Sequence, residues 1–428
     1  MRTRTTRVLT VGAALLATLT ATAPAHALEQ AEASATSTPW AASWAAAEQY
    51  PRQPFWPNDW SKAGFQDQTL RQVIRLSSGG SRLRISLTNR YGTQPLQIAG
   101  ATIARSEGGA TVDRGSLRPL KFDGRTATTI PPGEGLTSDP VAFPTQALES
   151  VTVTLYLREP TGPATYHAGA NATSYRADGD HRFDPRSTDF DETSTSWYLL
   201  NGVHADGPAE APGTVVAFGD SLTDGRGTAL DENNRYPDEL AELLAARGTP
   251  RPVANLGIDG SKFLVDSPCF GESGLKRFRD QVLTQPGAEV AIVSIGLNDI
   301  GSAGWPEGFC GANPAVTAEQ LMAAHREVVR LAHEHGLLAV AGTMPPMKGH
   351  SYHSPDNERI KDEVNEWIRT SGVYDRVVDF EKVLADPEDP DALNPALDSG
   401  DHIHPNDEGR HRMAQAVLAA LEPIPSRP

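Results

Sequence analysis

The sequence predicts two folds in one chain: an antiparallel, jelly-roll-like β-sandwich, followed by an α/β domain whose parallel sheet carries helices on both faces. Two observations predict this division. Short runs of alternating apolar and polar residues dominate the first half of the chain, whereas apolar strands alternate with helical segments in the second half. The length of 428 residues is sufficient for two or three domains of ordinary size.

The first 27 residues have the pattern of a secretory signal peptide. Arginines precede an uncharged apolar run over Val8–Ala23, and a small-x-small cleavage site ends at Ala27. We therefore expect cleavage near Ala27 and a secreted, extracellular protein. A membrane anchor is the alternative, but the run is short for a span of about 20 apolar residues. Residues 28–39 follow as a flexible leader rich in Ala, Ser, Thr and Glu.

Composition excludes several classes of function. The formal net charge of −16 lacks the basic footprint on which nucleic-acid binding normally depends, so we expect no nucleic-acid partner. Two cysteines are too few for a disulfide scaffold or for a zinc site built mainly from cysteine. In an exported protein Cys269 and Cys310 are expected to form a disulfide, and two unrelated thiols are the alternative. We expect a soluble monomer without stable insertion into a membrane.

Residues 40–203 are predicted to form the β-sandwich. Leu70–Leu76 and Leu83–Thr88 have the pattern of the two arms of a hairpin, in which Gly79-Gly80 would supply the positive φ of a tight turn. Residues 204–213 contain a Gly-Pro and a Pro-Gly pair, which break regular structure, and are predicted to form a linker.

Residues 214–422 are predicted to form the α/β domain, and residues 423–428 a short tail. The predicted strands are Val215–Phe218, Val253–Leu256, Val290–Ile295, Leu337–Ala341 and Val377–Phe380. The predicted helices are Tyr236–Arg247, Leu275–Leu283, Ala318–His335, Asn357–Thr370 and Asp407–Leu421. Parallel sheets place ligands beyond the carboxyl ends of their strands, so we expect the chemistry in the loops that follow them.

Two of these loops carry groups that could face a substrate. Ser221 stands at a Gly-flanked turn from strand to helix after Asp220, where its hydroxyl and its backbone NH would be accessible. A capping turn is the alternative reading of this segment. Gly257 and Gly260 follow the second strand and would allow a backbone amide to approach a ligand closely, although an ordinary loop has the same pattern.

Two later segments complete the set. Asn298 follows the third strand and could donate its amide to an oxyanion, while Asp299 is better placed to brace the loop. Asp401 precedes His404 by three residues, so its carboxylate could fold back onto Nδ1 and orient the ring. An N-capping turn with a surface histidine is the alternative. We expect all four segments at the ends of strands.

Together these segments resemble the block motifs of the SGNH (GDSL) hydrolase family over about residues 214–422. The matching residues are Gly219-Asp220-Ser221-Leu222, Asn255 with Gly260, Gly296-x-Asn298-Asp299, and Asp401-x-x-His404-Pro405. The first half of the chain resembles, much more loosely, the β-domain that precedes the hydrolase domain in some secreted bacterial members.

The resemblance implies a three-layer, flavodoxin-like α/β/α domain and a serine mechanism without metal or cofactor. Ser221 would be the nucleophile and His404 the base, oriented by Asp401. The oxyanion would be bound by the NH of Ser221, the NH of Gly260 and the amide of Asn298. We therefore expect a carboxylesterase or acetylesterase that forms an acyl-enzyme on short-chain esters, either small molecules or glycans. The segment Gly260–Gly311 lies between two oxyanion elements and holds both cysteines, so we expect it to carry acyl specificity.

Three alternatives stay open at this point. An extracellular lipase or lysophospholipase of the same family would use the same residues. A metal-assisted hydrolase could use His402 and His404 with Asp401, or the histidine pairs at 333/335 and 350/353. A non-catalytic carbohydrate-binding protein could use an aromatic platform in the first half, although core packing is the commoner role of such residues. The aromatic residues concerned are Trp40, Trp44, Trp56, Trp60 and Trp197.

Overall fold

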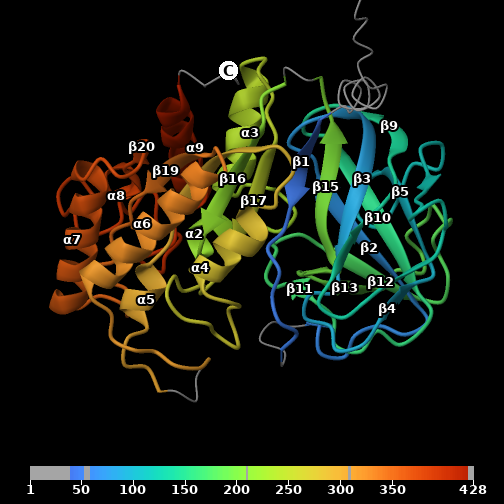
Figure 1. Cartoon of the computed structure of the whole chain (residues 1–428), viewed down its shortest axis with the longest axis horizontal. Coiled ribbons are helices and arrows are strands. Elements are labelled where there is room, and N and C mark those ends of the chain that lie inside the picture. Colours follow the sequence, from blue (N-terminus) through green and yellow to red (C-terminus); the bar gives the residue numbers. More distant parts are fainter. Residues whose placement is uncertain (1–38, 53–57, 209–210, 307–309, 423–428) are drawn as a thin grey trace, which may run out of the picture. The chain divides into compact units, whose positions relative to one another are not determined.

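The computed structural model describes residues 39–52, 58–208, 211–306 and 310–422, and these residues lie in one compact unit. Antiparallel sheets occupy the first half of the chain, and a parallel sheet with its helices occupies the second (Figure 1). The signal peptide predicted for residues 1–27, the leader up to residue 38 and the tail lie outside the described residues. Among the described residues, no helix combines the length and apolar character needed to cross a membrane.

Two antiparallel sheets form the first half. One sheet has the order β1-β15-β3-β8, with β9 also paired to β3, and its strands are β1 (Trp40–Ala45), β15 (Leu200–Asp206), β3 (Gly80–Thr88), β8 (Gly135–Thr137) and β9 (Val141–Thr145). The other has the order β13-β12-β2-β10-β5-β6, formed by β13 (Glu192–Ser194), β12 (Ser174–Asp178), β2 (Gln68–Arg75), β10 (Ser150–Leu157), β5 (Gly100–Arg105) and β6 (Arg118–Pro119). Small two-stranded sheets are formed by β11 (Tyr166–His167) with β14 (Trp197–Tyr198) and by β4 (Leu96–Ile98) with β7 (Thr128–Ile130).

Alternation of side chains along the strands produces the core between the two sheets. Leu83, Ile85 and Leu87 of β3 are fully buried, while the residues between them are only half-buried. They belong to the same apolar cluster as Leu70 of β2 and Val153 of β10, which lie in the opposite sheet. The prediction of an antiparallel β-sandwich is therefore confirmed.

The hairpin predicted around Gly79-Gly80 is wrong. β2 and β3 belong to different sheets, so the connection between them crosses from one layer of the sandwich to the other. Neither glycine has a positive φ. Both are needed instead for close approach, because a Cβ atom on Gly79 would lie 2.2 Å from the carbonyl oxygen of Thr145, and one on Gly80 would lie 2.4 Å from that of Asp206. β15 also extends to Asp206, three residues into the segment predicted as a linker.

The second half is built on a parallel sheet of five strands with the order β17-β16-β18-β19-β20. Its strands are β16 (Thr214–Gly219), β17 (Val253–Gly257), β18 (Ala288–Ser294), β19 (Leu338–Gly342) and β20 (Arg376–Val378). β16 is buried along its whole length, as expected of a central strand covered on both faces. The predicted strands correspond to these five, with ends that differ by at most two residues.

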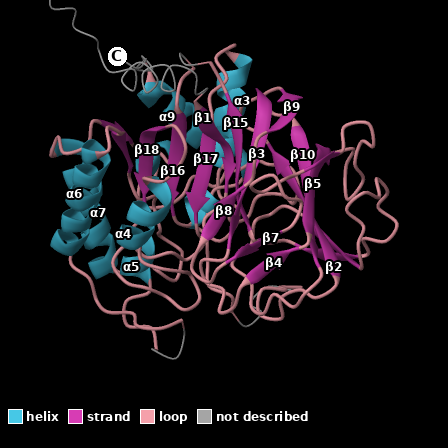
Figure 2. Ribbon diagram, turned by 45° about the vertical axis from the view of Figure 1, so that its right-hand side comes forward, coloured by secondary structure: helices cyan, strands magenta, loops and turns pink. Residues whose placement is uncertain are grey.

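Helices cover both faces of this sheet. The described helices are α2 (Ser221–Asp224), α3 (Tyr236–Ala246), α4 (Gly274–Arg277), α5 (Leu297–Gly301), α6 (Ala318–Glu334), α7 (Pro355–Thr370), α8 (Phe380–Leu384) and α9 (Asp407–Leu421). Apolar residues of α6 and α7 pack on one face together with Phe218 of β16, and those of α3, α8 and α9 pack on the other with Val215. Figure 2 shows the helices of this half beside its strands. The three-layer α/β/α prediction is confirmed. The helix predicted over Leu275–Leu283 is α4 followed by a π-helical turn at Phe278–Val282.

The strand ends locate three of the four predicted segments. Ser221 follows β16, Gly260 follows β17, and Asn298 follows β18, so the three loops meet at one edge of the sheet. The fourth segment differs from the prediction, because Asp401 and His404 follow α8 and a long loop rather than the end of a strand. They are held at the same edge because His404 lies shortly before α9, which packs against α3 and α8.

Candidate active site

The turn between β16 and α2 presents Ser221. Asp220 caps α2 by accepting a hydrogen bond from the NH of Leu222, and Gly225 ends the helix in the left-handed conformation. Gly219 permits the sharp turn, because a Cβ atom there would lie 2.2 Å from Oγ1 of Thr223 and 2.4 Å from the carbonyl oxygen of Ser294. Local geometry thus directs the Ser221 hydroxyl out of the end of the sheet.

A chain of hydrogen bonds joins Ser221, His404 and Asp401. The Oγ atom of Ser221 lies 2.8 Å from Nε2 of His404, and Nδ1 of His404 lies 2.6 Å from Oδ2 of Asp401. The other carboxylate oxygen of Asp401 accepts the backbone NH groups of Ile403 and His404. The Asp401 carboxyl also shows a shifted pKa, since burial raises it but the hydrogen bonds and charge of His404 outweigh this and hold it well below its usual range. An ionised Asp401 accepts a hydrogen bond from the Nδ1–H group of His404, which leaves Nε2 unprotonated and able to accept the proton of the serine hydroxyl.

Asn298, at the start of α5, faces the same space. Its Nδ2 donates one hydrogen bond to the carbonyl oxygen of Ser261 at 3.1 Å, and its Oδ1 accepts one from the hydroxyl of Tyr352 at 3.0 Å. These two bonds fix the orientation of the amide, which retains a second N–H. Gly260 lies opposite with a positive φ of 74°, and a Cβ atom there would lie 2.5 Å from the ring of Phe270.

These groups line a cleft with a volume of about 240 Å³. Of the predicted site residues, Asp220, Ser221, Gly260, Asn298, Asp401, His404 and Cys310 line it. Asp299 lies behind the wall, where its carboxylate accepts the NH groups of Phe263 and Leu264 at 2.6 and 2.9 Å. These two hydrogen bonds tie the loop after β17 to the start of α5. Burial raises the pKa of the Asp299 carboxyl to about 6, against the effect of these two hydrogen bonds.

Two contributors to the site were not identified from the sequence. Arg277 is fully buried, and its guanidinium donates to the carbonyl oxygens of Leu256 and Gly219 and to the hydroxyl of Ser261, all within 3.0 Å. It ties together the loops after β16 and β17. Tyr352 carries the hydrogen bond to Asn298, and the nearby His350 accepts the NH of Tyr352 at Nδ1. The sequence shows Arg277 only as a charged residue in a predicted helix and Tyr352 only as a tyrosine in a loop. No pattern in the sequence indicates which atoms these two side chains bind.

Cys269 and Cys310 are joined in a disulfide that spans 41 residues. Cys310 lines the cleft, and its carbonyl oxygen accepts a hydrogen bond from Ser267 at 2.8 Å. Phe270, next to the other cysteine, also lines the cleft and packs over Gly260. The disulfide therefore closes a loop that forms one wall of the cleft.

Replacement of both cysteines by serine is expected to lower the free energy of unfolding by about 3–4 kcal/mol, because the unfolded chain loses the constraint of the closed loop. The KM for a short ester is expected to rise in the same variant, because the loop that forms the cleft wall is no longer held by the disulfide. Urea unfolding and steady-state kinetics measure the two effects, and reduction of the wild-type protein should reproduce them. Unchanged stability together with unchanged KM would contradict the assigned role of the loop.

Burial determines the charge of Asp220. Its carboxyl is 2% exposed, and burial raises its pKa to about 7, against the hydrogen bond from Leu222. The folded-state pKa of Asp220 lies above its unfolded value of about 4. Ionisation of Asp220 therefore lowers the free energy of unfolding, and this loss is absent below pH 4, grows with pH and is complete above pH 7.

Replacement of Asp220 by asparagine retains a capping side chain and removes this cost. The difference in free energy of unfolding between variant and wild type is expected to increase by about 2–4 kcal/mol from pH 4 to pH 8. Calorimetric melts across that range measure it, with the exposed Asp191→Asn as a control that should show no such increase. A difference that does not vary with pH would contradict the raised pKa.

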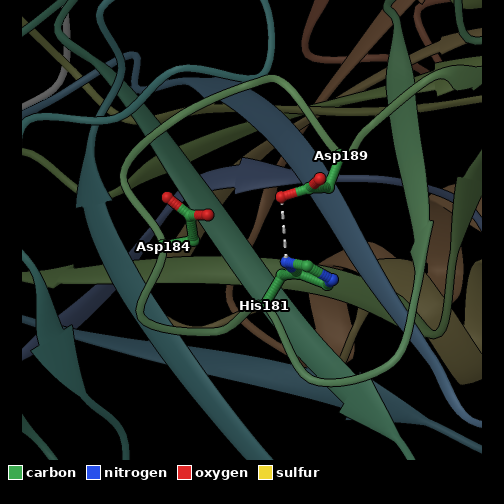
Figure 3. Close-up of side chains that lie close together, drawn as sticks. All are labelled: His181, Asp184 and Asp189. Atoms are coloured by element: carbon green, nitrogen blue, oxygen red, sulfur yellow. Dashed lines mark ion pairs between the residues drawn. The ribbon is translucent and has the colours of Figure 1, made fainter.

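A second group of ionisable residues lies outside the cleft, on the β-sandwich. His181, Asp184 and Asp189 offer atoms within 4.8 Å of one another, and Nδ1 of His181 pairs with Asp189 at 3.4 Å (Figure 3). Asp184 is bound by the guanidinium of Arg186 through two hydrogen bonds of 3.0 Å, which hold the pKa of its carboxyl down at about 2. A cation already occupies this carboxylate, so the group is better described as an ion-pair network than as a metal site.

Three of the histidines considered as metal ligands have other partners. His402 pairs with Asp398 at 2.8 Å, and His333 pairs with Asp375 at 2.9 Å. Nδ1 of His335 contacts the carbonyl oxygen of Leu331, one turn back in its own helix. Each of these contacts is a local structural interaction.

The tryptophans that the structure describes in the first half do not form an exposed platform. Trp44, Trp60 and Trp197 are buried, and Trp44 packs edge-on against Trp197 with ring centroids 4.8 Å apart. Trp40 is half-buried beneath the guanidinium of Arg84, and Trp56 lies outside the described residues. The buried rings serve core packing, so the carbohydrate platform expected under the binding-protein alternative is not available to them.

The second half of the chain is similar to known proteins. Residues 217–412 match the GDSL-like lipase/acylhydrolase family, which confirms the resemblance of this segment to that family. No curated protein matches the chain. Similar solved structures include an acetyl xylan esterase variant from Geobacillus stearothermophilus, with 21% identity, 50% of this chain and 97% of that chain covered, and a TM-score of 0.38.

Two further solved structures have similar sequence identity, coverage and TM-scores. An alpha/beta hydrolase enzyme from the metagenome of Lake Arreo, Spain, shows 23% identity, with 50% of this chain and 98% of that chain covered and a TM-score of 0.37. A GDSL-like lipase from Bacteroides thetaiotaomicron VPI-5482 shows 19% identity, with coverage of 49% and 88% and a TM-score of 0.35.

Proposed function

We propose that this chain, whose residues 217–412 form a GDSL-like lipase/acylhydrolase domain, is a secreted serine esterase that hydrolyses short-chain carboxylic esters. The observation that carries the proposal is the chain of hydrogen bonds from Ser221 through His404 to Asp401, which opens into a cleft that Gly260 and Asn298 also line. A serine hydroxyl becomes nucleophilic at neutral pH when a base accepts its proton, and this arrangement supplies that base.

The first half of the reaction acylates the serine. Oγ of Ser221 attacks the ester carbonyl while its proton passes to Nε2 of His404, and the ionised Asp401 stabilises the imidazolium that forms. The carbonyl oxygen becomes negatively charged, and it accepts hydrogen bonds from the NH groups of Ser221 and Gly260 and from Nδ2 of Asn298. When the tetrahedral intermediate collapses, His404 returns the proton to the leaving alcohol.

The second half releases the acid. A water molecule loses a proton to Nε2 of His404 and attacks the acyl carbonyl, and the same three donors stabilise the second tetrahedral intermediate. Collapse of this intermediate breaks the bond to Oγ and returns the proton to Ser221. Apart from the ester and one water molecule, every group that this cycle uses belongs to the residues named.

Two features favour a short acyl group. The cleft volume of about 240 Å³ suits a small substrate. Polar groups contribute much of its wall, including Arg226, Lys262 and Asn313, so a long alkyl chain would leave them without water. Esters of small alcohols or of glycans both fit this chemistry. The disulfide agrees with secretion, because such bonds persist in oxidising compartments.

A graded ester panel tests the proposal. The full chain should hydrolyse p-nitrophenyl acetate and butyrate with kcat/KM at least about tenfold above octanoate and palmitate, because longer chains exceed the cleft. A fluorophosphonate should add covalently to Ser221 with loss of activity, as mass spectrometry of the labelled peptide would show. EDTA should leave the rate unchanged. An optimum at C8 or beyond would indicate the lipase alternative, and activity lost to EDTA but unaffected by the phosphonate would overturn the serine mechanism.

A further inference from the structure

A buried histidine of the β-sandwich half contacts the hydrolase domain directly beneath the serine turn. His167 belongs to β11 and is 4% exposed. Its Nε2 lies 3.0 Å from Oδ1 of Asp224, the last residue of α2, and its Nδ1 lies 3.0 Å from the carbonyl oxygen of Ala47. The ring also stacks on Trp197 at a centroid distance of 5.5 Å. Both nitrogens and one face of the imidazole are therefore held.

Asp224 connects this histidine to the loop that carries Gly260. Its second carboxylate oxygen, Oδ2, accepts the backbone NH of Asp259 at 2.7 Å. Asp259 immediately precedes Gly260, so the carboxylate fixes the peptide next to the proposed oxyanion donor. The two strand-end loops also touch here, because a Cβ atom on Gly257 would lie 2.2 Å from the backbone nitrogen of Asp224.

Asp224 is equally fixed to the serine turn. Its NH donates to the carbonyl oxygen of Asp220 at 2.9 Å, and α2 separates it from Ser221 by less than one helical turn. Its carboxylate thus hydrogen-bonds both to the β-sandwich half and to the residue before Gly260. A shift of this carboxylate would move the NH of Gly260 relative to Oγ of Ser221.

We propose that His167 is a positioning residue supplied by the β-sandwich half, which holds Asp224 in the orientation that keeps the Asp259–Gly260 peptide aligned as an oxyanion donor. This inference rests on the proposed function, because it assigns Gly260 to the oxyanion hole. It gives the first half of the chain a part in the reaction: the hydrolase domain requires a side chain from its neighbour to complete the alignment of its own loop.

Two substitutions separate the hydrogen bonds of His167. In His167→Gln the amide nitrogen occupies the place of Nε2 and retains donation to Asp224, whereas contact with Ala47 is lost. In His167→Asn the amide nitrogen occupies the place of Nδ1 and retains donation to Ala47, whereas contact with Asp224 is lost. Both variants remove the ring and its stacking on Trp197, so the loss of that packing is common to the two.

We expect His167→Asn to lower kcat by about 10–100-fold with KM changed by less than about threefold, because a donor used in the transition state is misaligned. His167→Gln should stay within about threefold of wild type. Glu242→Gln, which removes the ion pair of Glu242 with Arg75 between the two halves, should leave both constants unchanged. Equal kcat for the Asn and Gln variants would overturn the proposal. If neither folds, Asp224→Asn should show the same loss of kcat.

Amide hydrogen exchange gives a readout that does not depend on activity. The Asp259 NH should exchange at least about tenfold faster in His167→Asn than in His167→Gln, because only the former releases its acceptor. Equal exchange rates would overturn the positioning role even if the enzyme proved inactive on every ester. Conversely, a wild-type protein without esterase activity but with this difference in exchange would refute the proposed function alone.

Discussion

Replacement of Ser221 by alanine is expected to lower kcat for p-nitrophenyl acetate by about 10⁴- to 10⁶-fold, with little change in the melting temperature. The substitution removes only the hydroxyl group of Ser221, which hydrogen-bonds to His404 and does not contribute to the apolar core. Steady-state kinetics and calorimetry measure the two quantities. Ser371→Ala, just beyond the end of α7 and outside the cleft, is the matched control and should retain full activity.

Ser221 and His404 should behave as one unit. His404→Ala is expected to lower kcat to a similar degree, and the double variant should be no slower than either single variant, since each loss alone already prevents proton transfer from serine. Multiplicative effects in the double variant would mean that the two residues act independently and would falsify the proposed mechanism. Residual hydrolysis in all three variants should come from the oxyanion donors, which remain in place.

These residues could be located from sequence because parallel strands end at one edge of a sheet. Ser221, Gly260 and Asn298 each follow a strand, so a correct division into strands and helices was sufficient to bring them together. His404 was different. It follows α8 and a long loop, and only its spacing from Asp401 and the family motif indicated its place in the site.

Contacts made by backbone atoms could not be predicted in this way. Arg277 holds the site through the carbonyl oxygens of Leu256 and Gly219, and every residue carries such an oxygen, so no side-chain pattern reveals the partner. The error at Gly79-Gly80 has a related cause. Alternation shows that β2 and β3 are strands, but the sheet that each joins depends on pairing with residues far away in the chain.

Among the residues that do not exchange protons during the reaction, Asn298 is expected to give the largest loss of kcat when it is replaced. Replacement by alanine should lower kcat by about 100–1,000-fold and leave KM within about threefold, because its amide binds charge that exists only in the transition state. Asn298 is not needed for the serine to react with a phosphonate, so labelling should slow but not disappear. A variant in which KM rises while kcat stays constant would place Asn298 in substrate binding instead.

Tyr352 provides the test of why the asparagine is effective. Burial raises the pKa of its hydroxyl far above neutral, so it stays protonated and donates to Oδ1 of Asn298 at 3.0 Å. Tyr352→Phe removes only this hydrogen bond and should lower kcat by about 3–10-fold, through rotation of the amide away from its aligned position. Combined with Asn298→Ala, the same substitution should have no further effect, because the group it orients is already absent. An additional loss in the double variant would show that the tyrosine hydroxyl contacts the substrate itself, and the oxyanion hole would then include a fourth donor.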